Sequence, residues 1–192
     1  MTLKILAFAA SLRTGSYNKR LVAIAAHGAR AAGAEVTLLD LRDLPMPIYD
    51  GDIEKQQGLP PNAKAFKRLL IEHQGVLVAS PEYNSQMPAL LKNSIDWASR
   101  LEPGDTPMVA FKGKVAGVTS ASRGALAGLR SQTMVRSLLS YLGMIVVPTQ
   151  IGVARAHEAF DESGRLLDEK QHSAVEALGA EVAHMVRALT IS

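Results

Sequence analysis

Five continuous apolar runs, separated by segments with helical periodicity, are the feature that most restricts the fold of this chain. The runs cover residues 3–10, 34–39, 75–80, 115–120 and 144–147. Most of them are apolar throughout, which is typical of parallel strands that are buried on both faces. Strands that alternate with helices in this way predict an α/β fold, an open, doubly wound parallel sheet with helices on both faces.

The segments between the runs carry apolar residues at the three- and four-residue spacing of a helix face. One predicted helix carries Leu21 and Ile24 and ends at Gly33, and four more cover residues 62–73, 89–100, 124–142 and 167–189. There are no repeats or linkers, so residues 1–192 are expected to form a single domain. The long, proline-rich segment 40–61 is expected to run over the surface beside the second strand, as functional or interface loops often do.

Composition excludes several kinds of protein. The chain has no cysteine, which rules out disulfides, cysteine-ligated iron–sulfur centres and thiol catalysis and fits a cytoplasmic protein. The N-terminus does not read as a signal peptide, and no apolar run approaches the ~18 residues of a membrane span. The formal net charge is only +3, from scattered Lys and Arg. Neither nucleic acid nor a membrane is therefore an expected partner.

A polar loop follows the first apolar run and opens a helix, with the sequence Ser11-Leu12-Arg13-Thr14-Gly15-Ser16-Tyr17-Asn18. The first N–H groups of a helix lack internal partners and carry the positive end of its dipole, and hydroxyls and a guanidinium add further donors for an anion. The loop has neither the lysine of a P-loop nor the pattern G-x-G-x-x-G, so a phosphate monoester fits better than a pyrophosphate. An ordinary turn with a serine cap explains the same residues about as well.

Two further polar loops follow the third and fourth runs. Residues 81–88 offer the flat face of Tyr83 and the amide of Asn84, which suit a planar heteroaromatic ring, although a solvated proline-bounded loop explains them too. Residues 119–125 lead into the helix predicted from Gly124, whose positive end would face the same crevice. Ligands of doubly wound sheets bind outside the carboxyl ends of the strands. The joint occurrence of three such loops therefore indicates one binding site.

Here the chain resembles a known family, the NADPH-dependent FMN reductases of flavodoxin-like fold, which includes bacterial quinone, chromate and azo-dye reductases. The resemblance is carried by the first loop, by Pro81-Glu82-Tyr83-Asn84 and by Leu91-Lys92-Asn93-Ser94-Ile95-Asp96-Trp97-Ala98-Ser99-Arg100. Residues 120–124 and 160–165 extend it more loosely over nearly the full length. It implies a five-stranded parallel sheet in the order 2-1-3-4-5, an FMN cofactor, NADPH or NADH as co-substrate, and a homodimer or homotetramer.

By position, the resemblance also implies three groups of cofactor-binding residues. The FMN phosphate site would be formed by Ser11, Arg13, Ser16, Tyr17 and Asn18. The loop at the flavin ring would be formed by Pro81, Glu82, Tyr83 and Asn84. The third loop would contribute Ser120, Ser122 and Gly124. No catalytic side chain is implied, because the flavin carries the chemistry. The five histidines show no metal-ligand spacing and are expected mostly on helix exteriors or ends.

The implied activity is an NAD(P)H oxidoreductase that passes a hydride from nicotinamide to bound FMN. A small-molecule acceptor (a quinone, free flavin, azo compound or oxidised metal ion) then takes the electrons in a ping-pong cycle. The alternative is a non-enzymatic electron carrier of the flavodoxin type. Such carriers are usually strongly acidic, whereas this chain is +3. A flavin-binding regulatory protein without turnover is a third possibility.

Three residues keep two readings each. Arg123 either meets the nicotinamide nucleotide or faces water, and Arg100 either pairs with Glu82 or is a plain surface residue. Trp97 is expected to pack inside the protein or at a subunit contact. That contact is expected near the segments 83–100 and 40–61, because Met87, Leu90, Ile95 and Trp97 suggest apolar exposure around a short helix.

Overall fold

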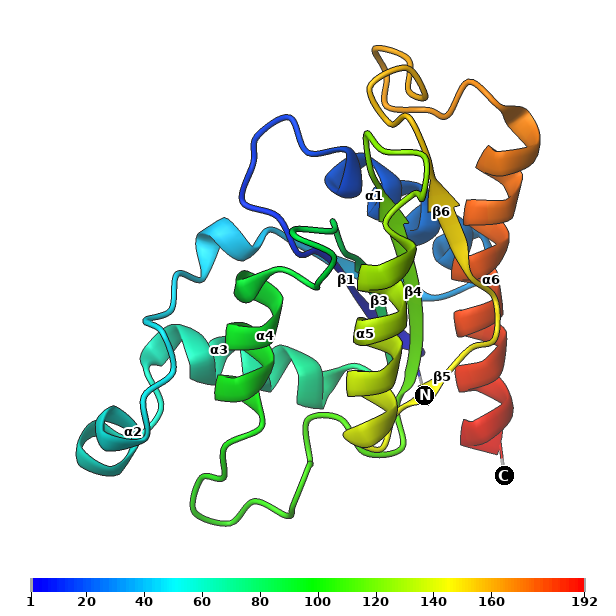
Figure 1. Ribbon diagram of the computed structural model, residues 1–192. Helices are drawn as coiled ribbons and strands as arrows, with labels where there is room; N and C mark the ends of the chain where they lie inside the picture. Colours follow the sequence, from blue (N-terminus) through cyan, green and yellow to red (C-terminus); the bar gives the residue numbers. More distant parts are fainter. Residues whose placement is uncertain (1, 192) are drawn as a thin grey trace.

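A parallel sheet forms the centre of the protein, which is described by a computed structural model over residues 2–191. Its main strands are β1 (Lys4–Ala9), β2 (Glu35–Leu39), β3 (Gly75–Ala79), β4 (Val115–Ala121) and β5 (Ile145–Val146). They lie in the order β2-β1-β3-β4-β5 with every neighbouring pair parallel (Figure 1). The predicted fold class and strand order are therefore confirmed.

Helices cover both faces of the sheet, as Figure 1 shows. On one face α1 (Tyr17–Ala31) and α6 (Glu169–Ile191) pack against the odd-numbered residues of β1; on the other, α3 (Pro61–Glu72), α4 (Ala89–Ala98) and α5 (Leu129–Tyr141) pack against its even-numbered residues. Successive side chains of a strand point to opposite faces. The continuous apolar runs thus supply two cores from one set of strands.

A sixth strand was not predicted. β6 (Ile151–Val153) pairs with the carboxyl end of β4, where Thr119 lies opposite Ile151, and the Thr119 hydroxyl donates to the Ile151 carbonyl at 2.7 Å. The run at 144–147 forms only the two-residue strand β5, which pairs with the first residues of β4. The last residues of β4 extend beyond β5 and pair with β6 instead. A three-residue strand is too short for its periodicity to be visible in the sequence.

The segment 40–61 is more structured than expected. It contains a 3-10 turn, Leu41–Asp43, and a helix, α2 (Gly51–Gln57), and it packs against α4. Trp97 is fully buried there, donates from Nε1 to the Pro47 carbonyl at 2.9 Å, and meets the Tyr49 ring edge-on at 5.0 Å. α2 buries none of its residues, so it lacks the apolar stripe by which a helix is recognised.

Helices α1 and α6 touch at backbone distance. A methyl group at Gly28 would lie 2.0 Å from the Glu176 carbonyl oxygen, and one at Gly179 would lie 1.8 Å from that of Ala25. Only glycine leaves room for this approach. The contact brings His27 on α1 beside Glu176 on α6. Across residues 2–191, every helix is too short or too polar to cross a bilayer.

Candidate functional site

A cavity of about 230 Å³ lies where the β1–α1, β3–α4 and β4–α5 loops meet. All three loops leave the carboxyl ends of parallel strands and so lie at the same end of the sheet (Figure 1). Nine of the twelve predicted site residues line this cavity: Ser11, Arg13, Ser16, Tyr17, Asn18, Pro81, Glu82, Tyr83 and Ser122. Asn84, Ser120 and Gly124 do not, and Ala121 and Arg123 line it as well.

The β1–α1 loop surrounds the N-terminus of α1 with hydrogen-bond donors. Ser16 caps the helix by accepting from the Lys19 amide, and the first turn contains no acidic residue. The amides of Tyr17 and Asn18 open the helix, where N–H groups have no intrahelical acceptor. Ser11 is buried and the Arg13 side chain is exposed at the rim. This end of the cavity therefore carries the positive potential that attracts an anion.

The side chain of Asn18 has a different role from the one predicted. Its Nδ2 donates to the Ala121 carbonyl and its Oδ1 accepts from the Ala121 amide, both at 2.9 Å. The amide thus ties α1 to the end of β4 and has little capacity left for an anion.

The β3–α4 loop is a tight hairpin. Tyr83 and Gln86 exchange two backbone hydrogen bonds of 3.1 and 3.0 Å across it. The two residues at its tip, Asn84 and Ser85, have φ of 51° and 64°, the left-handed pair of a type I′ turn, which glycine adopts more readily than serine. The turn holds Tyr83 at the cavity, about half exposed, and directs Asn84 away from it.

Glu82 caps α5. Its carboxylate accepts from the Arg130 amide at 3.0 Å, from Arg130 Nη1 at 3.1 Å and from the Ser131 amide at 3.4 Å. The suggested pair with Arg100 is wrong, because Arg100 donates to the Asp96 carbonyl and lies over the Tyr49 ring. A carboxylate already occupies the positive end of α5, so this helix offers little potential to a ligand.

The third loop also differs from the expectation. α5 begins at Leu129, after Gly128 with a φ of 79°, so Gly124 lies in a turn and no helix dipole starts there. Ser120 is buried, where its hydroxyl donates to the Ala127 carbonyl and accepts from Gln132 Nε2. Tertiary packing thus uses Ser120 to shape the loop, and Arg123 reaches the cavity in its place.

A charge cluster supports the β1–α1 loop from outside the cavity. Asp40 accepts from Lys19 Nζ at 2.7 Å and from Arg42 Nη2 at 2.8 Å, and Arg42 Nη1 donates to the Thr14 hydroxyl. Burial raises the pKa of Asp40, but the hydrogen bonds from Arg42 and Lys19 outweigh it and hold that pKa well below its ordinary value. The ionised carboxylate therefore stabilises the folded state.

Replacing Asp40 with Asn is expected to lower the free energy of unfolding at neutral pH. Because the Asp40 pKa is lowered on folding, its contribution is present above the ordinary carboxyl pKa and is lost as pH falls through the folded value. The difference between wild type and Asp40→Asn should thus shrink in acid. Urea unfolding at neutral and acidic pH measures it, with the exposed neighbour Asp43→Asn as control. An equal difference at both pH values would contradict the assignment.

Other polar clusters lie outside this cavity. Within residues 2–191, no group of three histidine or acidic side chains is arranged to hold a metal ion. Two histidines at helix ends are buried: His73 at the end of α3, which bonds the Leu69 carbonyl and the Thr37 hydroxyl, and His172 at the start of α6. A larger groove of about 490 Å³ runs between α1 and α6, where Lys19, Arg20 and His172 are among the residues that line it.

Comparisons with known proteins agree with the geometry. The sequence profile described as NADPH-dependent FMN reductase matches residues 3–158. The chain is 35% identical to an NAD(P)H-dependent FMN reductase of Pseudomonas aeruginosa, over 91% of this chain and 90% of that one. It is 32% identical to a quinone reductase of Escherichia coli, over 87% and 86%.

Solved structures share the fold at lower identity. The flavoenzyme NAD(P)H:(acceptor) oxidoreductase of Paracoccus denitrificans superimposes with a TM-score of 0.81 at 24% identity, over 97% of this chain and 98% of that one. A flavodoxin from the domain Archaea gives a TM-score of 0.63 at 13% identity, over 96% and 99%. At these identities the likeness establishes the fold.

Proposed function

Because this chain belongs to the NADPH-dependent FMN reductase family and is an NAD(P)H-dependent oxidoreductase that uses FMN, we propose that it reduces quinones or other two-electron acceptors by a ping-pong mechanism. When bound, FMN supplies the redox chemistry, taking a hydride from NAD(P)H and passing two electrons to the acceptor. The observation that carries the proposal is the cavity at the carboxyl edge of the sheet, with an anion site at one end and an exposed tyrosine at the other.

The α1 end of the cavity is assigned to the FMN phosphate. The Ser11 and Ser16 hydroxyls, the first amides of α1 and the Arg13 guanidinium form a donor set for a single phosphate monoester. Since no acidic residue lies in the first turn of α1, the helix dipole is not offset there. These residues fit the cofactor that the family uses.

The hairpin at Tyr83 is assigned to the flavin ring. Its residues are held by two backbone hydrogen bonds, and the Glu82 cap fastens the loop to α5, so the wall of the cavity is rigid. The volume of about 230 Å³ is below the ~300–1,000 Å³ usual for small-molecule sites. Because the cavity is this small, a ring bound here would keep one face exposed to solvent. Donor and acceptor would then have to bind at that face one after the other. That alternation is the reason to expect ping-pong kinetics.

Steady-state kinetics with purified protein and FMN test this proposal. Oxidation of NADPH, followed by the loss of its absorbance, should depend on a quinone and give parallel double-reciprocal plots. The quinone reductase relatives motivate this acceptor class, and FMN should bind more tightly than FAD because the α1 site takes a terminal monoester. Intersecting plots would contradict the alternation, and no turnover with any acceptor would favour the flavodoxin-type carrier.

Arg123 is proposed to bind the phosphates of the nicotinamide co-substrate. It is exposed, lines the same cavity as Arg13, and makes no ion pair within residues 2–191. Arg123→Ala is expected to raise the KM for NADPH by about tenfold, the effect of about 1.4 kcal/mol, and to leave FMN affinity unchanged. Initial rates at saturating FMN measure it. A larger effect on FMN affinity than on this KM would assign Arg123 to the flavin instead.

We also propose a homodimer or homotetramer. The apolar exposure that the sequence suggested around a short helix is wrong for Ile95 and Trp97, since both are buried within one chain. Large apolar side chains are nevertheless exposed near the same segments, with Ile48 at 75%, Leu101 at 57% and Tyr83 at 48%. Such exposure favours an interaction surface. Light scattering at micromolar concentration tests this, and a monomer with full FMN affinity would overturn it.

A further inference from the structure

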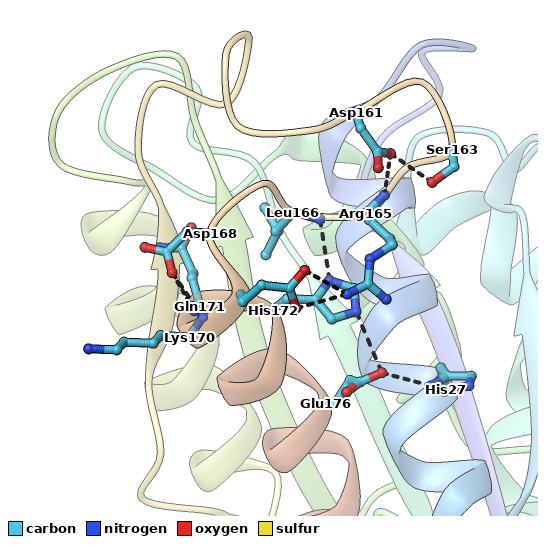
Figure 2. A network of polar contacts seen from close by, with 11 residues as sticks. His27, Asp161, Ser163, Arg165, Leu166, Asp168, Lys170, Gln171, His172 and Glu176 are labelled. Atoms are coloured by element: carbon cyan, nitrogen blue, oxygen red, sulfur yellow. Dashed lines mark hydrogen bonds and ion pairs between the residues drawn. The ribbon is translucent and has the colours of Figure 1, made fainter.

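A hairpin at residues 160–166, which we call the clasp, lies beside the cavity and beyond the end of the family match at residue 158. Phe160 and Leu166 pair as an isolated antiparallel bridge. Between them, Asp161 Oδ1 accepts from the Ser163 hydroxyl at 2.7 Å and from the Arg165 amide at 2.9 Å (Figure 2). The clasp is therefore a turn closed by its own hydrogen bonds.

One side of the clasp touches the proposed FMN site. The Phe160 ring stacks on the Tyr17 ring, with centroids 6.0 Å apart and planes inclined by 12°. Tyr17 opens α1 and lines the cavity. Stacked aromatic pairs contribute stability beyond the area that they bury. The position of the clasp therefore affects the position of Tyr17.

The other side of the clasp is held by a buried histidine. Figure 2 shows the Leu166 amide pointing at the His172 ring, to whose Nδ1 it donates at 3.3 Å. His172 is 5% exposed, and its Nε2 lies 3.5 Å from Glu176 Oε1. Because Nδ1 accepts a hydrogen bond, Nε2 carries the ring hydrogen and directs it at Glu176. Only the neutral ring with this tautomer satisfies both contacts.

The charged groups around this ring are few. Glu176 on α6 faces it, and His27 on α1 shares the same carboxylate oxygen at 2.8 Å. Lys19, Arg20 and Arg165 line the adjoining groove, where Lys19 pairs with Asp40 and Arg165 with Glu169. Protonation of His172 at Nδ1 would set an N–H against the Leu166 N–H. The hydrogen bond from Leu166 would then be lost, even if the ion pair between His172 and Glu176 became stronger.

We propose that neutral His172 is a positioning residue, which holds the clasp closed and thereby keeps Tyr17 in place for FMN. The inference rests on the proposed FMN site. It makes FMN affinity depend on a residue outside the cavity, because an open clasp would no longer hold Tyr17.

Two substitutions distinguish the roles of the two ring nitrogens of His172. In His172→Asn the side-chain oxygen can take the place of Nδ1 and accept from Leu166, whereas in His172→Gln the amide reaches the place of Nε2 and leaves Leu166 without its acceptor. His184→Gln, exposed on the same helix, is the matched control. At about pH 8, His172→Gln should raise the Kd for FMN about fivefold, roughly the loss of one aromatic stack. His172→Asn should stay within about twofold.

Equal affinities of His172→Gln and wild type for FMN would overturn the proposal. Failure of wild type itself to bind FMN would instead reject the proposed function.

Phe160→Ala tests the same link without altering the histidine. It should raise the Kd for FMN about as much as His172→Gln, and the double variant should be no weaker than either single one, because both act through one contact. If His172→Gln does not fold, Phe160→Ala still decides the matter. Wild-type affinity in Phe160→Ala would overturn the proposal.

Discussion

Replacing Arg13 with alanine is expected to weaken FMN binding by about 2–4 kcal/mol, because it removes one partner of a charged contact that becomes partly desolvated when the phosphate binds. Arg13 lines the cavity beside the opening turn of α1, and its side chain makes no ion pair within residues 2–191 that would restrain it. Each 1.4 kcal/mol corresponds to tenfold in Kd. Fluorescence titration of FMN measures the change directly.

The Arg13 variant should lose affinity more than turnover. At saturating FMN, kcat should remain near the wild-type value, because the proposed contact of Arg13 is with the phosphate end and not with the ring. Arg68→Ala is the control, an exposed arginine on α3 that pairs with Glu72 one turn away. A Kd for Arg13→Ala within about a factor of three of wild type would show that Arg13 is not a phosphate ligand.

Trp97→Ala is expected to lower the free energy of unfolding by about 3–5 kcal/mol, the usual effect of removing a buried tryptophan. Trp97 is fully buried with Leu59 and Ala63, and its indole N–H is the donor to the Pro47 carbonyl. Its loss opens a cavity under the segment 44–60 and leaves that carbonyl without its partner. In a chain of 192 residues the Tm should fall by roughly 10 °C.

Circular dichroism is the suitable measurement, because Trp97 is the sole tryptophan and its fluorescence disappears with it. Tyr141→Ala is the matched control: this aromatic side chain is 85% exposed, and surface changes of that kind alter stability by about 0.5 kcal/mol or less. A loss in Trp97→Ala no greater than in this control would mean that segment 44–60 does not depend on the indole.

Local sequence patterns were enough to predict where the five main strands lie along the chain. The apolar runs at residues 3–10 and 75–80 became the central strands because burial on both faces requires side chains that are apolar at every position. Parallel order then brought the three polar loops to one end, so nine of twelve site residues were placed at one cavity. The strand order itself came from the family resemblance.

What the sequence by itself determined is which runs form the buried strands and where each main strand gives way to a loop, because strand burial and helix capping are encoded by neighbours along the chain. Tertiary structure alone decided the partners of the polar side chains. Asn18 bonds Ala121, 103 residues away, and Glu82 bonds Arg130, 48 residues away. Such hydrogen bonds depend on how packed elements face one another, and no local pattern records that. The start of α5, the strand β6 and the clasp held by His172 follow from the same cause.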